Sequence, residues 1–153
     1  QGARKVTGNP RSAEAFFGVE VARPGRPKPG NRDARMSAKR RRVLVVEDEV
    51  LVAMMIEDML AALGYQVLGP AMHLSAALAL AETEQIDVAV LDVNLGRGER
   101  SFPLAKLLRE RRIPFIFITG YGTAGLLDEF RDVTTLHKPV EPEELEKALD
   151  ATL

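Results

Sequence analysis

Three runs of four apolar residues, which lie far apart in the chain, most constrain how this sequence can fold. They are Val43–Val46, Val88–Leu91 and Phe115–Ile118, and each ends at a polar residue: Glu47, Asp92 or Thr119. Runs this short, bounded by polar residues, predict strands that are buried on both faces, as in a parallel sheet covered by helices. Because ligands of such sheets bind beyond the carboxyl ends of the strands, the three polar residues are candidates for a site.

Weaker patterns complete an alternation of strands and helices. Apolar residues that recur three or four apart between the runs predict helices. Two more strands are expected, over 65–68 and 134–136, and helices are expected over 50–63, 75–84, 101–108, 126–130 and 142–149. Gly69-Pro70 is expected to close the strand over 65–68, and Ser75 to cap the helix that follows. Five strands that alternate with five helices predict a doubly wound α/β sheet, with helices on both faces and the flavodoxin-like strand order 2-1-3-4-5.

The first expected helix has the clearest period. Its apolar side chains share one face: Leu51, Met54, Met55, Met59, Leu60 and Leu63. We interpret this face, methionines included, as ordinary core, because methionine fills irregular gaps in protein interiors.

Charge divides the chain near residue 42. Residues 1–42 carry 12 Lys and Arg against 3 Asp and Glu, whereas residues 43–153 carry 9 against 19. The first stretch also holds four prolines and no sustained apolar period. We therefore expect residues 1–42 to be a basic, disordered arm and residues 43–153 to be the folded domain. Met36 is a candidate natural start, which would make residues 1–35 non-native or an upstream extension.

Several classes of protein are disfavoured by composition. The chain has no cysteine, which excludes a disulfide scaffold and a thiolate metal site. It has neither a secretory signal nor an apolar run near the roughly 18 residues of a membrane span, so a cytoplasmic location and no membrane contact are expected. The basic run Lys39–Arg42 has no helix-turn-helix or interleaved aromatics beside it, so nucleic acid is a disfavoured partner.

The expected strand order brings the polar strand ends into one crevice. Strands one and three would lie side by side where the order reverses, so Glu47 and Asp48 would meet Asp92. Carboxylates at such a place suit Mg²⁺, which prefers oxygen ligands in an octahedron and retains several waters. The candidate ligands are Asp48 and Asp92 directly, Glu47 through water, and the backbone carbonyl of Asn94.

A carboxylate, a divalent cation and a lysine together predict a phosphoryl acceptor, because that transfer depends mainly on positioning and charge neutralisation. Asp92 is the candidate nucleophile, and its product would be an acyl phosphate. Lys138 would lie across the crevice and bind one phosphoryl oxygen, and the Thr119 hydroxyl would reach another.

Four short motifs carry a family resemblance. Val45–Glu49, Val90–Asn94, Ile118–Gly120 and Lys138–Pro139 resemble the signatures of the receiver domain of two-component response regulators, and the resemblance extends from about Arg42 to Leu153. It implies that Asp92 accepts a phosphoryl group from a phosphohistidine on a histidine kinase or a histidine phosphotransfer protein. It also implies a cis Lys138–Pro139 bond, and a signalling domain that catalyses only its own phosphorylation and dephosphorylation.

Residues near the fourth strand depart from the usual receiver pattern. Pro114–Gly122 is similar to a subgroup, found in alphaproteobacteria, of Phe-Ala-Thr-Gly-type single-domain receivers. Most receivers have Tyr or Phe three residues before the lysine, where this chain has Thr135, and the segment between Thr119 and Lys138 is shorter than usual. We therefore hypothesise that phosphorylation changes the order of Gly120–Asp132 rather than the position of an aromatic ring.

Two other functions remain open. A degenerate receiver would act as an interaction module without phosphorylation. A phosphatase of the haloacid-dehalogenase type would need a carboxylic acid two residues after its nucleophile, where this chain has Asn94. With no room for an effector domain before Val43 or after Leu153, output is expected through protein contact or as a phosphate sink, unless the sequence is part of a longer chain.

Overall fold

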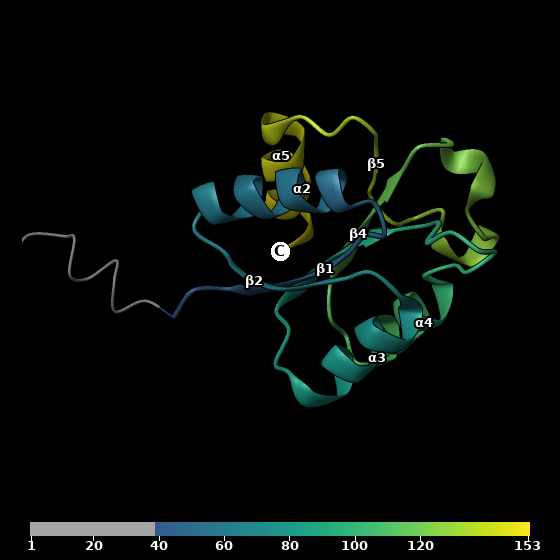
Figure 1. Cartoon of the computed structure of the whole chain (residues 1–153), viewed down its shortest axis with the longest axis horizontal. Helices are drawn as coiled ribbons and strands as arrows, with labels where there is room; N and C mark the ends of the chain where they lie inside the picture. Colours follow the sequence, from purple (N-terminus) through teal and green to yellow (C-terminus); the bar gives the residue numbers. More distant parts are fainter. Residues whose placement is uncertain (1–38) are drawn as a thin grey trace, which may run out of the picture. The chain divides into compact units, whose positions relative to one another are not determined.

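Five parallel strands form one sheet in the order β2-β1-β3-β4-β5 in the computed structural model, which describes residues 39–153 (Figure 1). The strands are β1 (Arg42–Val46), β2 (Gln66–Ala71), β3 (Val88–Asp92), β4 (Phe115–Thr119) and β5 (Thr135–His137). Every residue of β3 and β4 is buried, as expected of central strands covered on both faces. The predicted strand order is therefore confirmed. The arm was predicted over residues 1–42; residues 1–38 lie outside the described residues, and Arg42 is the first residue of β1.

Four α-helices cover the two faces of the sheet. They are α2 (Val50–Ala62), α3 (Leu74–Thr83), α4 (Phe102–Glu110) and α5 (Pro142–Thr152). Helices α2 and α5 lie on one face, and α3 and α4 lie on the other (Figure 1). Alternate residues of β1 enter the two cores, with Val43 and Val45 packing beside α2 and α5, and Leu44 and Val46 beside α3 and α4. Among the described residues, no helix has the length and apolar character that crossing a membrane requires.

The expected fourth helix is absent from residues 120–134. Two 3-10 helices take its place, η2 (Thr123–Gly125) and η3 (Asp128–Phe130). The prediction of one helix through Leu126, Leu127 and Phe130 is therefore wrong. Leu126 and Phe130 are buried but Leu127 is exposed, so these side chains do not share one inner face. Gly122 also has a positive φ of 70°, which breaks the backbone path at the start of η2.

Four phenylalanines fix this segment to the rest of the core. Phe130 stacks on Phe102 of α4, with ring centroids 5.6 Å apart. Its ring also meets Phe117 edge-on at 5.6 Å and Phe115 at 6.1 Å, both from β4. The segment that replaces the fourth helix is thus anchored by one buried ring rather than by an amphipathic face.

Strand β2 continues through the Gly69-Pro70 pair that was expected to end it. The pairing of β1 with β2 shifts register between Leu44 and Val46, which marks a bulge. Gly69 has a φ of +93°, and a side-chain carbon there would lie 2.6 Å from the Ala71 nitrogen. Only glycine fits this position, so the pair bends the strand instead of closing it.

The predicted cap of α3 is also wrong. The helix begins at Leu74, its N-cap residue is His73, and no side chain of that residue caps it. Ser75 therefore lies inside the first turn. The Leu74 nitrogen donates instead to Glu99 Oε1 at 2.7 Å, so a carboxylate from the loop after β3 supplies the cap.

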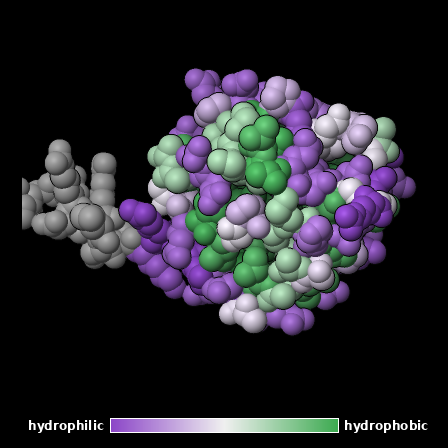
Figure 2. All heavy atoms as spheres, in the orientation of Figure 1, coloured by the Kyte–Doolittle hydropathy of each residue, from purple (hydrophilic) through white to green (hydrophobic). Residues whose placement is uncertain are grey.

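The α2 face that was predicted to be core is only partly so: Leu60 is buried and Met59 packs against the core, but Leu51, Met54 and Met55 are exposed. Val50, Leu51, Met54 and Met55 are 57%, 76%, 54% and 50% exposed, and hydrophobic residues gather over this helix in Figure 2. The buried residues of α2 are Ala53, Ile56 and Leu60. We call the four exposed side chains the α2 patch. Contiguous exposed apolar side chains of this kind mark interaction sites in soluble proteins.

Candidate functional site

The ends of β1, β3 and β4 and the residues after β5 meet at the carboxyl edge of the sheet. Parallel pairing aligns Val46 of β1 with Leu91 of β3, and Asp92 of β3 with Ile118 of β4. The residues that follow β1 and β5 therefore lie at the same edge as the ends of β3 and β4. The strand order reverses between β1 and β3, which is where ligands of such sheets bind.

Lys138, which follows β5, connects three carboxylates. Its Nζ lies 3.1 Å from Asp92 Oδ2, 3.0 Å from Glu47 Oε2 and 2.9 Å from Glu49 Oε1. Burial lowers the pKa of Lys138, but the contacts with Glu49, Glu47 and Asp92 outweigh burial and raise the pKa above its ordinary value. The ammonium is therefore charged throughout the physiological range and neutralises part of an acidic centre. Its peptide bond to Pro139 is cis, as the family resemblance implied.

Glu47 is the most deeply buried acid of the site. Its side chain has no exposed surface, and Oε1 accepts a hydrogen bond of 3.0 Å from the Glu49 nitrogen. Oε2 makes an ion pair with Lys138 Nζ at 3.0 Å, but within the described residues it accepts no hydrogen bond. Burial raises the pKa of Glu47 to about 7, and the charge of Asp92 contributes to the rise.

Asp92 is the last residue of β3, and its side chain is only 4% exposed. Oδ1 accepts a hydrogen bond of 3.2 Å from the Asn94 nitrogen, and Oδ2 accepts one from Lys138. Burial raises the pKa of the Asp92 carboxyl, and the Lys138 charge opposes that rise. The carboxylate is thus poorly hydrated and held at both oxygens, which favours a defined direction of attack.

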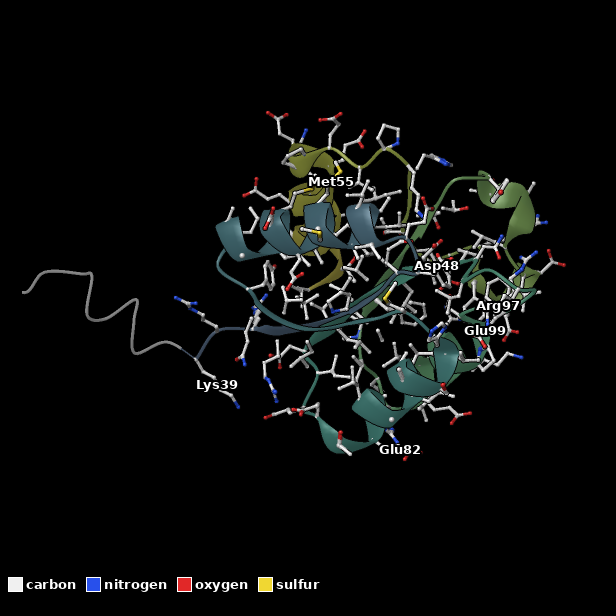
Figure 3. The ribbon with its side chains drawn as sticks, in the orientation of Figure 1. Lys39, Asp48, Met55, Glu82, Arg97 and Glu99 are labelled. Carbon is white, nitrogen blue, oxygen red and sulfur yellow. The ribbon has the colours of Figure 1, made fainter. Side chains whose placement is uncertain are left out.

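A cavity of about 440 Å³ opens above Asp92. The loops after β1, β3 and β4 line it, together with the side chain of Lys138. In Figure 3, Asp48 from the loop after β1 lies at the same end of the sheet as Arg97 and Glu99 from the loop after β3. A phosphoryl group is small enough to enter such a space, so the site is open to a small anion.

Thr119 ends β4 and is almost fully buried. Its hydroxyl accepts a hydrogen bond of 3.1 Å from the Tyr121 nitrogen, and its carbonyl accepts one of 2.9 Å from the Lys138 nitrogen. In the described part of the chain, its hydroxyl makes no hydrogen bond to Asp92. The hydroxyl proton therefore remains available to a further acceptor.

The acidic residues have the composition and spacing of a divalent cation site. Glu47, Asp48, Glu49 and Asp92 each offer one carboxylate oxygen, and these oxygens lie within 4.8 Å of one another. Glu47 also has a buried oxygen, Oε2, which makes an ion pair with Lys138 but no hydrogen bond in the described residues. The candidate ligands are all oxygen atoms, and the site has four acids but one lysine, so it fits a hard cation such as Mg²⁺.

The loop after β3 approaches Asp48 closely. Gly96 has a φ of +76°, and a side-chain carbon there would lie 3.0 Å from Asp48 Oδ2. A larger residue would therefore strain the backbone and press on the carboxylate. Asn94 lines the same cavity and is held beside Asp92 through its backbone nitrogen.

The residues predicted from the sequence come together at this edge: Glu47, Asp48, Asp92, Asn94, Thr119 and Lys138. The sequence interpretation left out Glu49, which contacts Lys138 as closely as Glu47 and Asp92 do. Its position directly after Glu47 and Asp48 was the available signal, since three adjacent acids need a nearby cation.

The chain is similar in sequence to known proteins that share a receiver domain. A family model described as the response regulator receiver domain matches residues 43–150. The chain is similar to the transcriptional regulatory protein PdtaR of Mycobacterium tuberculosis, with 30% identity over 102 residues that cover 67% of this chain and 50% of that protein. It is also similar to the phyllosphere-induced regulator PhyR of Methylorubrum extorquens, with 30% identity over 114 residues that cover 72% and 43%. The chain thus spans about half the length of the curated relatives it matches.

Solved structures share the fold. SdrG from Sphingomonas melonis Fr1 aligns with a TM-score of 0.68 and 43% identity, covering 74% of this chain and 96% of that one. A BeF3-activated conformation of SdrG aligns with a TM-score of 0.63 and 44% identity, covering 72% and 93%. The sheet order and the helix layers described above therefore recur in solved relatives at substantial identity.

Proposed function

The chain belongs to the response regulator receiver family, and from this premise we propose that Asp92 is the residue on which it receives a phosphoryl group. Receivers act in phosphorelays, so the donor is a phosphohistidine. One observation carries the assignment: Asp92 is a buried carboxylate at a strand end that contacts Lys138, beside three more acids, below an open cavity.

The proposed transfer is a single in-line displacement. The N–P bond of the phosphohistidine breaks as an O–P bond forms at a carboxylate oxygen of Asp92. The imidazole nitrogen keeps the bonding electron pair and takes up a proton from solvent. Asp92 gains the phosphoryl group as an acyl phosphate.

Two side chains of this chain are placed to stabilise the transferred group. The Lys138 ammonium already contacts Asp92 Oδ2 at 3.1 Å, so it can bond to a phosphoryl oxygen attached there. The Thr119 hydroxyl has a free proton, and the backbone carbonyl of Thr119 accepts a hydrogen bond from the Lys138 nitrogen. We propose that it bonds to a second phosphoryl oxygen.

A magnesium ion would be held by Glu47, Asp48, Asp92 and the backbone carbonyl of Asn94. When bound, it supplies positive charge that neutralises the phosphoryl oxygens. The cluster of carboxylate oxygens, which lie within 4.8 Å of one another, supports this assignment. The domain then catalyses only its own phosphorylation and dephosphorylation.

The phosphodonor is a histidine kinase or a histidine phosphotransfer protein, and we propose that it docks on the α2 patch. Helix α2 begins at Val50, directly after Glu49 of the cavity wall, so a partner over this patch can present its histidine to Asp92. A small pocket of about 60 Å³ shares Met55 with the patch and Lys138 with the site; Val52, Met59 and Pro139 also line it. The exposed apolar residues supply the contact area.

The proposal also covers the output of the domain and its location in the cell. The output is contact with a downstream protein or service as a phosphate sink, and the domain acts in the cytoplasm. The rival function, an interaction module that is never phosphorylated, leaves the open cavity and the Lys138–Asp92 contact without a role.

Incubation with Mg²⁺ and acetyl phosphate tests the function. Intact-mass spectrometry is expected to show addition of one phosphoryl group to the wild-type protein and none to Asp92→Asn. A chelator is expected to abolish the addition. Equal labelling of Asp92→Asn would overturn the assignment of Asp92, and labelling that persists with chelator would overturn the role of the cation.

A further inference from the structure

We propose that Glu49 is a positioning residue, which holds Lys138 in the resting site and must release it when a phosphoryl group arrives at Asp92. Glu49 would thereby lower the affinity of the site for the phosphoryl group. This inference rests on the proposed function, because it concerns the same phosphoryl group.

Three carboxylates surround the Lys138 ammonium in the resting state, two through hydrogen bonds and one, that of Glu47, through an ion pair. An ammonium has three hydrogens, and three carboxylates lie within 3.1 Å of this one. Its contacts with Glu49 at 2.9 Å and with Asp92 at 3.1 Å have hydrogen-bond geometry. A phosphoryl oxygen that approaches Lys138 therefore competes with these carboxylates for the ammonium.

Burial decides which carboxylate can leave. The side chains of Glu47 and Asp92 are 0% and 4% exposed, whereas that of Glu49 is 62% exposed. A buried carboxylate that loses its cation has no water to replace it, so its separation is strongly unfavourable. Glu49 can exchange Lys138 for solvent. It is the acceptor that an incoming phosphoryl oxygen can displace with the smallest penalty.

The backbone around Glu49 favours the same exchange. Glu49 is the N-cap residue of α2, yet its side chain makes no capping hydrogen bond, because it contacts Lys138 instead. Once released, the carboxylate still lies at the positive end of the helix dipole, where negative charge is favourable. Release therefore leaves no isolated charge.

Loss of the Glu49 charge should raise the affinity of the site for an anion by a modest factor. Removing the Glu49 charge frees one donor of Lys138 and removes a competitor of the phosphoryl oxygen, so anion affinity rises. An ion pair with one exposed partner is weak, so the expected increase is about two- to fivefold.

The test measures binding of beryllofluoride, a phosphoryl mimic, by NMR titration at saturating Mg²⁺. Glu49→Gln is compared with Glu141→Gln, because Glu141 is an exposed acid just after Lys138 that makes no contact with it in the described residues. We expect Glu49→Gln to bind beryllofluoride two- to fivefold more tightly and Glu141→Gln to stay near wild type. Equal affinities of the two variants, or weaker binding by Glu49→Gln, would overturn the proposal.

Two further measurements separate positioning from other roles. In a Lys138→Ala background, Glu49→Gln should change beryllofluoride affinity no more than Glu141→Gln does, since Glu49 acts through the lysine. The Lys138 ammonium protons should also exchange faster with water in unliganded Glu49→Gln. An effect of Glu49→Gln that survives without Lys138 contradicts the proposal.

Failure of the proposed function has a different signature. If wild type and Asp92→Asn bind beryllofluoride alike, Asp92 is not the acceptor and both proposals fall. If wild type alone binds it and Glu49→Gln matches Glu141→Gln, only the role of Glu49 falls. A loss of Mg²⁺ affinity specific to Glu49→Gln would instead make Glu49 a metal ligand and overturn its positioning role.

Discussion

The guanidinium of Arg109 lies over the ring of Phe130, with its central carbon 5.0 Å from the ring centroid. The same side chain donates to the Glu129 carbonyl at 2.6 Å and to Asp132 at 3.0 Å. One residue of α4 therefore contacts η3 and the residues after it through a cation–π contact, a backbone hydrogen bond and an ion pair. Contacts from α4 therefore help to fix the segment that replaces the expected fourth helix.

Phe130→Ala should strongly destabilise the domain. Phe130 is fully buried among three other rings, so its truncation leaves a cavity and is expected to lower the free energy of unfolding by about 3 to 5 kcal/mol. Urea denaturation measures the change. Tyr121→Ala, at a site that is 78% exposed, is the control and should change stability by less than about 0.5 kcal/mol. Equal stabilities of the two variants would contradict the anchoring role.

Phosphorylation should change the order of Gly120–Asp132. The segment lacks an amphipathic helix and depends on contacts from α4 and from Arg100 before it, whose side chain donates a hydrogen bond of 3.2 Å to the Gly125 carbonyl. We expect backbone amide relaxation in this segment to differ between the free and the beryllofluoride-bound protein. Residues of α3 serve as the internal control. Identical relaxation in the two states would refute the hypothesis.

The stability of the metal-free domain should fall as pH rises from about 4.5 to about 7. The pKa of Glu47 is raised from 4.5 to about 7 on burial, so in this window the native state retains a proton that the unfolded state has lost. The stabilisation is complete below about 4.5 and is lost above about 7. Glu47→Gln cannot titrate and should lack this slope. The measurement is the free energy of unfolding against pH, in chelator.

The same shift makes Mg²⁺ binding depend on pH. Because a metal ligand must be deprotonated, binding should release a proton from Glu47 and become tighter as pH rises toward about 7. Calorimetric titrations in buffers of different ionisation enthalpy would detect the released proton. Proton release of the same size from Glu47→Gln would assign the proton to another group.

Leu51→Asp should impair transfer from a protein donor but not from a small molecule. Leu51 is 76% exposed at the centre of the α2 patch, so a charge there should weaken docking without disturbing the core. We expect the rate of phosphorylation by a phosphotransfer protein to fall at least tenfold, about 1.4 kcal/mol, while the rate with acetyl phosphate stays unchanged. Leu127→Asp, at an exposed site outside the patch, is the matched control. A fall with both donors would indicate damage to the site itself.

The sheet and the meeting of the site residues could be predicted because both follow from local pattern. Four apolar residues in a row identify a strand buried on two faces, and the strand order then brings Glu47, Asp92 and Thr119 to one edge. These three side chains could be assigned to the site from their positions at strand ends alone.

Other features depend on contacts that periodicity does not reveal. The period of α2 shows which residues share a face, but not which face packs on the sheet. Ala53, Ile56 and Leu60 are the buried residues of the helix, whereas Met54 and Met55 are exposed. Glu49 was overlooked because the direction of an exposed carboxylate depends on Lys138, 89 residues away.

The contacts that α4 and Arg100, just before it, make with η2 and η3 bear on how findings from one receiver apply to another. Arg100, Lys106 and Arg109 lie outside the motifs that define the acceptor site, yet they hold the loop next to it. Two relatives with identical acceptor signatures can therefore differ in loop behaviour through substitutions in α4 or just before it. Comparisons of signalling output across this family should align those three cations as carefully as the phosphorylated aspartate.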